Sequence, residues 1–92
     1  MKEENQEMEM LKEILDDISE LIAETRASRS ELKQLERQSR EEFAHKKTTS
    51  FTYDIRLEKL RRAYQEVDYC LRSLEHQRKL TMETINRLRE LD

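Results

Sequence analysis

Hydrophobic residues recur along the first half of the chain at alternating spacings of three and four. This heptad spacing is typical of a helix that packs against one neighbouring helix through a narrow seam. With Leu11 at position a, the predicted seam residues are Leu11, Ile14, Ile18, Leu21, Leu32 and Leu35. A parallel line formed by Met8, Leu15 and Ile22 widens the apolar stripe over the first 24 residues.

A second heptad line follows in the other half of the chain, with Leu57 at position a. Its apolar members are Leu57, Leu60, Tyr64, Val67, Leu71, Leu74, Ile85 and Leu88. The two frames do not join, because the first frame would place Tyr53 at a and the second places it at d. A four-residue stutter within one continuous helix would also reconcile them.

The break in the pattern falls at residues 48–53, where hydroxyl, β-branched and aromatic residues are weak helix formers. Ser50 or Thr52 is expected to cap a new helix there, with Asp54 in its first turn. We therefore predict an all-α, two-helix antiparallel hairpin that resembles a coiled coil. Its single domain spans 1–92, with a helix over 3–46, a turn at 47–52 and a helix over 53–91.

The absence of glycine and proline agrees with few turns, and 42% charged residues leave little material for a core. A lone hairpin would leave half of each apolar stripe in water. We therefore expect a four-helix bundle formed by a homodimer, or a helical partner protein. The candidate oligomer or partner interface lies at the open end of the hairpin. It comprises Met8, Leu15, Ile22, Met82 and Leu91.

Charge is distributed unevenly. Residues 1–24 carry two lysines against nine acids, a net of −7, whereas residues 25–62 carry eleven basic residues against six acids, a net of +5. The turn end thus forms a candidate basic patch, which either binds an acidic partner such as nucleic acid or is a solvated surface. Its residues are Arg37, Arg40, Lys46, Lys47, Arg56, Lys59, Arg61 and Arg62.

No residue pattern supports catalysis. Glu42 and His45 have the Glu-x-x-His spacing of di-iron bundles, but such sites need two copies and further carboxylates in a core. Asp16 and Asp17 point in different helical directions. We expect no enzyme activity, no metal site and no cofactor. Without a bilayer-spanning run or a basic, apolar leader, and with Cys70 alone, the chain is expected to be cytoplasmic.

The stretch Tyr64-Gln65-Glu66-Val67-Asp68 resembles the Tyr-x-x-x-Asp/Glu signal of the small helical-hairpin proteins exported by type VII secretion. The resemblance covers five residues and implies a secretion-associated hairpin or its chaperone. The Trp-x-Gly turn of that family is missing, because the chain has neither tryptophan nor glycine. Tyr64 also falls on the predicted seam rather than in a tail.

The function predicted from these patterns is a non-enzymatic protein–protein interaction module: a small adaptor, scaffold or regulatory subunit. It would act by helix-on-helix association. The alternatives are the secretion-associated hairpin and a nucleic-acid-binding accessory protein that uses the basic turn end.

Overall fold

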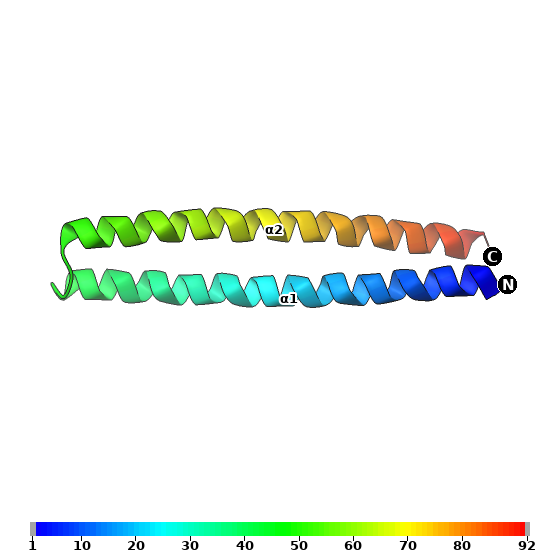
Figure 1. Cartoon of the computed structure of the whole chain (residues 1–92), viewed down its shortest axis with the longest axis horizontal. Helices are drawn as coiled ribbons and strands as arrows, with labels where there is room; N and C mark the ends of the chain where they lie inside the picture. The colour runs from blue at the N-terminus through cyan, green and yellow to red at the C-terminus, as the bar shows by residue number, and fades with distance from the viewer. Residues whose placement is uncertain (1, 92) are drawn as a thin grey trace.

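The computed structural model describes residues 2–91, with side chains from residue 6 onward. Two long helices, α1 (Lys2–Ala44) and α2 (Ser50–Glu90), lie side by side in opposite directions and are joined by one short turn (Figure 1). The Cα atoms extend over 68 × 15 × 14 Å. The predicted all-α hairpin is therefore confirmed, and the described residues contain no strand.

The turn lies earlier in the chain than the sequence pattern predicts. Helix α1 ends at Ala44 rather than near residue 46, and α2 already begins at Ser50. Thr49 is the cap of α2, because its hydroxyl accepts a hydrogen bond from the backbone N–H of Thr52 at 3.2 Å. Ser50 and Thr52, the predicted caps, lie within the first turn of the helix instead.

Helix α1 ends in a Schellman motif built without glycine. The N–H of Lys47 donates to the carbonyl of Glu42 at 2.8 Å, and the N–H of Lys46 donates to the carbonyl of Phe43 at 3.0 Å. Lys46 adopts the left-handed conformation, with φ 58°, that normally favours glycine. A turn without glycine is thus possible, at the cost of one strained lysine.

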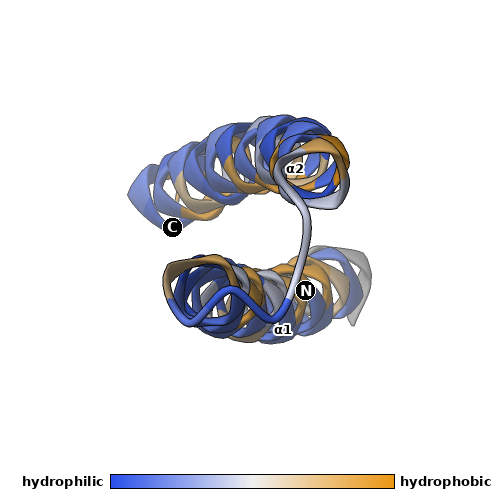
Figure 2. Cartoon of the chain, turned by 90° about the vertical axis from the view of Figure 1, so that its left-hand side faces the viewer, coloured by the Kyte–Doolittle hydropathy of each residue, from blue (hydrophilic) through white to orange (hydrophobic). Residues whose placement is uncertain are grey.

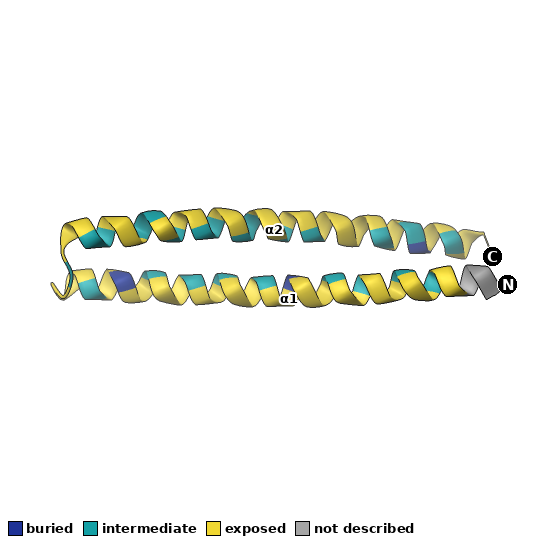
Figure 3. Ribbon diagram, viewed as in Figure 1, coloured by how far each residue is buried: buried dark blue, intermediate teal, exposed yellow. Residues whose placement is uncertain are grey.

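The core of the hairpin is thin. Among the residues whose burial is described, Ile22, Ile85 and Ser39 are buried, and most other inward-facing positions are half-buried (Figure 3). Hydrophobic positions lie mainly between the helices and hydrophilic ones on their outward sides (Figure 2). Near the turn, the rings of Phe43 and Tyr53 stack with centroids 4.4 Å apart. Side-chain burial between two helices therefore holds the hairpin together along its length.

Candidate interaction surface

Helix α2 presents the seam that its sequence predicts. Ile85 is buried, and the other seven predicted residues are half-buried. These seven are Leu57, Leu60, Tyr64, Val67, Leu71, Leu74 and Leu88. Interhelical hydrogen bonds join residues whose numbers add to about 99, as expected for the antiparallel pairing.

Helix α1 is rotated relative to the prediction. Leu11, Ile18 and Leu32 are half-buried as expected. However, Ile14, Leu21 and Leu35 are 44%, 48% and 51% exposed. Their places in the seam are taken by the parallel line, in which Met8 and Leu15 are half-buried and Ile22 is only 6% exposed.

The physical reason is that both lines alternate by three and four with the same set of positions, 11, 18, 25, 32 and 39. The parallel line continues to Arg29 and Glu36, which look unsuitable for a seam. Arg29 Nε nevertheless donates to Asp68 at 2.9 Å, and Glu36 accepts from the Tyr64 hydroxyl at 3.1 Å. Long side chains can thus pack their stems in the seam while their polar ends find partners at its edge.

This rotation changes the candidate oligomer interface. Met8, Leu15 and Ile22 face α2 within the same chain, so they are not a free surface. Met82 and Leu91, the members on α2, remain 42% and 82% exposed. The exposed apolar line of α1 is instead the one formed by Ile14, Leu21 and Leu35.

One side of the hairpin, here called the charged side, carries charged residues along both helices, interrupted by Ser19 and Met82. We define it by Lys12, Arg26, Lys33 and Arg40 on α1 and Asp54, Arg61, Asp68 and Glu75 on α2. Arg26 of α1 forms an ion pair with Glu75 of α2 at 3.5 Å, and Arg29 of α1 forms an ion pair with Asp68 of α2. Exposed pairs of this kind contribute about 0–1 kcal/mol each, so they orient the helices more than they stabilise them.

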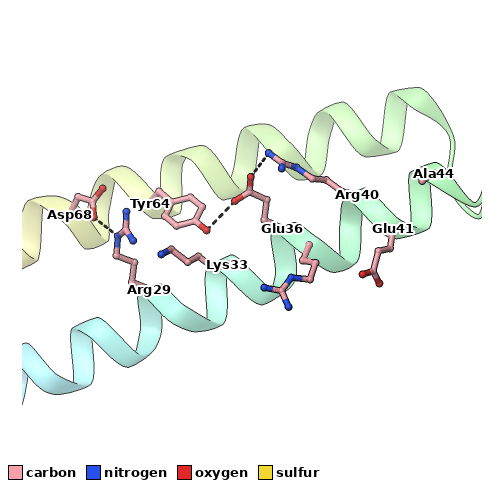
Figure 4. Close-up of a pocket in the computed structure, with 9 residues that line it drawn as sticks. Arg29, Lys33, Glu36, Arg40, Glu41, Ala44, Tyr64 and Asp68 are labelled. Carbon is pink, nitrogen blue, oxygen red and sulfur yellow. Dashed lines mark hydrogen bonds and ion pairs between the residues drawn. The ribbon is translucent and has the colours of Figure 1, made fainter.

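A shallow groove on the charged side contains several groups that pair with one another (Figure 4). Glu36 accepts from the Tyr64 hydroxyl and from Arg40, the latter at 2.6 Å, while the Arg29 guanidinium lies 5.6 Å from the centre of the Tyr64 ring. Desolvation, followed by the hydrogen bond to Glu36, raises the pKa of Tyr64 above its usual value of 10.0. Lys33, Arg37 and Glu41 also line the groove and form no side-chain hydrogen bond or ion pair with the described residues, so the groove is only partly paired within the chain.

The opposite side, here called the uncharged side, has no charged residue at four successive heptad positions of each helix. It is defined by Ile14, Leu21, Ser28 and Leu35 on α1 and Ala63, Cys70, Gln77 and Thr84 on α2. Met10 and Leu80 flank it, 62% and 44% exposed. Most exposed large hydrophobic residues of α1 thus gather beside an uncharged line of α2. Clustered exposed apolar residues are a general feature of protein interaction sites.

Two hydroxyls on the uncharged side are already satisfied within their own helices. Ser28 donates to the carbonyl of Glu24 at 3.2 Å, and Thr84 donates to the carbonyl of Leu80 at 2.9 Å. These groups therefore lose little if water is removed from the surface, because their donors keep a partner. The uncharged side can be covered at small cost in polar desolvation.

The eight residues of the candidate basic patch do lie around the turn, but four of them form ion pairs with acids nearby. Arg40 pairs with Glu36, Arg56 with Glu42, and both Arg61 and Arg62 with Glu58. Arg37, Lys46, Lys47 and Lys59 form no ion pair with the side chains that the structure describes. Three acids, Glu36, Glu42 and Glu58, thus offset part of the positive charge, and the patch has a weaker electrostatic footprint than its eight basic residues alone predict.

The geometry gives no support to a metal site among the described residues. Among the described residues, no group of three or more His, Cys, Asp or Glu side chains is placed to hold a metal ion. Cys70 is a free, exposed thiol on the uncharged side. Within the described range, neither helix has an apolar stretch long enough to cross a bilayer.

The sequence signal for the uncharged side was present but is easily missed. It is a lack of charge at every seventh position over 14–35 and over 63–84, in a chain that is 42% charged. Comparison with protein-family models, with curated proteins and with solved structures finds no match for this chain.

Proposed function

We propose that this protein is a non-enzymatic interaction module, an adaptor, scaffold or regulatory subunit, that associates through its uncharged side. The observation that carries the proposal is the exposure of Ile14, Leu21 and Leu35 beside the uncharged line of α2. A stiff hairpin 68 Å long presents these residues in a fixed array, so little conformational entropy is lost on binding.

The mechanism is helix-on-helix packing. The partner's helices would pack against the uncharged side of α1 and α2 and complete a four-helix bundle, in which each hairpin contributes two of the four helices. The charged side would remain in water, where its ion pairs already satisfy much of its charge. We propose a cytoplasmic site of action, in keeping with the single free thiol.

The test is capture of host proteins on the immobilised chain, with two matched variants. The double variant Leu21→Glu, Leu35→Glu places charges on the uncharged side and should abolish specific association, whether with itself or with another protein. The control Ile55→Glu, Met82→Glu changes residues that are 41% and 42% exposed elsewhere on the surface. Association that survives the first variant, or that both variants remove, would contradict the proposal.

A further inference from the structure

We infer that the uncharged side binds a second copy of this chain, related by a two-fold axis parallel to the long axis of the hairpin. Both turns then lie at the same end of a four-helix bundle. This inference rests on the proposed function and names its partner. The observation behind it is that large residues of α1 on the uncharged side lie level with smaller residues of α2.

Large and small residues face one another in this arrangement. Within one chain, the interhelical hydrogen bonds place each α1 residue of the uncharged side level with one of α2. The level pairs are Ile14 with Thr84, Leu21 with Gln77, Ser28 with Cys70 and Leu35 with Ala63. Rotation about the lengthwise axis sets α1 against α2 of the second copy and keeps these levels. Each large aliphatic side chain of α1 therefore meets a smaller or unbranched residue, which lets the helices interdigitate.

The charged residues at the edge of the uncharged side are also complementary in the lengthwise dimer. The uncharged lines end at the turn with Glu42 and Arg56, which pair within one chain. In the lengthwise dimer, each Glu42 also lies level with Arg56 of the second copy, so the four groups form an alternating ring of charge. One like-charged rim pair remains, Glu31 with Glu66 of the second copy, and both are exposed to solvent.

A two-fold axis across the hairpin fits less well. It would set Ile14 against Leu35 of the second copy and leave small residues against small residues along α2. It would also bring Asp17 near Glu31 of the second copy, and Lys59 near Arg87. Its advantage is that the acidic open end would meet the basic turn end, but that attraction acts over distances that salt screens beyond about 8 Å. Contacts at close range therefore decide the arrangement.

The available area is sufficient for a stable dimer. Because the lengthwise axis keeps all levels, the two copies overlap along their whole length, and the Cα extents of 68 and 15 Å set the size of the face. The uncharged lines over 14–35 and 63–84 occupy about 32 Å in the middle of this face, at about 1.5 Å per residue. Such a face offers roughly 1,000 Å² per copy, compared with about 800 Å² per partner in a typical stable interface. The acidic segments of both copies then lie at one end on diagonal helices, so added salt should strengthen the dimer.

The distance between the turns of the two copies distinguishes a lengthwise from a crosswise dimer. The native thiol is removed with Cys70→Ser, and a spin label is attached through Lys47→Cys, an exposed position in the turn. Pulsed dipolar spectroscopy should give a single label-to-label distance of about 20–40 Å, since the turns lie roughly two helix diameters apart. Adding Leu21→Glu and Leu35→Glu to the labelled chain should remove the dipolar coupling.

The other outcomes overturn the inference in distinct ways. A distance near the 68 Å length of the hairpin would show a crosswise dimer and refute the lengthwise axis, while association through the uncharged side would stand. A labelled chain without dipolar coupling would refute the second copy as partner, and the capture experiment would then decide the proposed function. Dipolar coupling that persists in the Leu21→Glu, Leu35→Glu background would refute both the lengthwise dimer and association through the uncharged side.

Discussion

The two sides of the hairpin differ in how far their side chains find partners within the chain. On the charged side, Arg26, Arg29 and Tyr64 find interhelical partners, so that surface is complete within one chain. On the uncharged side, Leu21 and Leu35 are about half exposed and have no covering helix. The difference teaches that a two-helix protein can be folded yet unfinished on one side, and that the unfinished side is the place to look for function.

The largest effect should come from placing charges in the seam rather than beside it. Leu15→Asp with Ile22→Asp should destabilise the hairpin by more than about 3 kcal/mol, because both side chains face α2 and Ile22 is 6% exposed. Ile14→Asp with Leu21→Asp changes the same residue types one position earlier. Circular dichroism of dilute protein should show lost helicity for the first pair alone. If the second pair unfolds the chain instead, the rotation of α1 described above is wrong.

Two serines of α1 distinguish the seam from the uncharged side in the same way. Ser39 is 8% exposed between the helices, so Ser39→Phe should overpack the seam and lower the free energy of unfolding by roughly 1–3 kcal/mol. Ser28 is exposed on the uncharged side, so Ser28→Phe should leave the unfolding of dilute protein nearly unchanged. Urea titration measures both. Equal losses would mean that Ser28 also lies within the hairpin seam.

A change on the charged side should weaken the hairpin without affecting association. Tyr64→Phe removes the hydrogen bond to Glu36 and should cost about 0.5–1.5 kcal/mol. Chemical denaturation and the mass in solution measure the two effects separately. A shift in association would mean that the two sides are not independent.

The same tyrosine gives a pH dependence. The pKa of Tyr64 is raised in the folded chain, chiefly by desolvation and then by Glu36, so the folded state holds the phenolic proton more tightly than the unfolded state. Its contribution is therefore full below pH about 10 and is lost as the pH rises through the folded pKa. Wild type should lose more stability than Tyr64→Phe in this range. Equal losses would assign the pH dependence to other groups.

The smallest effect is expected at the turn, away from both sides. Lys46→Gly relieves the left-handed conformation at φ 58° and should stabilise the hairpin by roughly 0.5–1 kcal/mol. Thermal unfolding measures the gain, and the mass of the protein should not change. A destabilised variant would show that the lysine side chain contributes more than its backbone strain costs.

The two helices show what sequence reasoning could and could not predict. In α2 no neighbouring heptad line carries large aliphatic residues at several successive positions, so its seam is unambiguous. In α1 two lines compete, and the true seam passes through Arg29 and Glu36, whose polar partners Asp68 and Tyr64 lie on the other helix. Periodicity within one helix contains no information about those partners. The cap at Thr49 was missed for a similar reason, since three neighbouring residues carry suitable hydroxyls.

The interaction surface was predicted to be at the open end and in a second line of α1. The structure instead leaves the first line exposed along the middle of the hairpin, beside Ala63 and Cys70. The rotation of α1 by one heptad position exchanges these two lines. The fold was therefore predicted from the sequence, but the apolar line that α1 leaves exposed was not.

Sedimentation equilibrium shows whether the protein associates through its uncharged side. Wild type and the Ile55→Glu, Met82→Glu control should sediment with twice the 11.3 kDa mass of the chain. The Leu21→Glu, Leu35→Glu variant should sediment as a single chain with unchanged helicity. If that variant keeps the mass of a dimer, or if the control also falls to a single chain, the uncharged side is not the surface through which this protein associates.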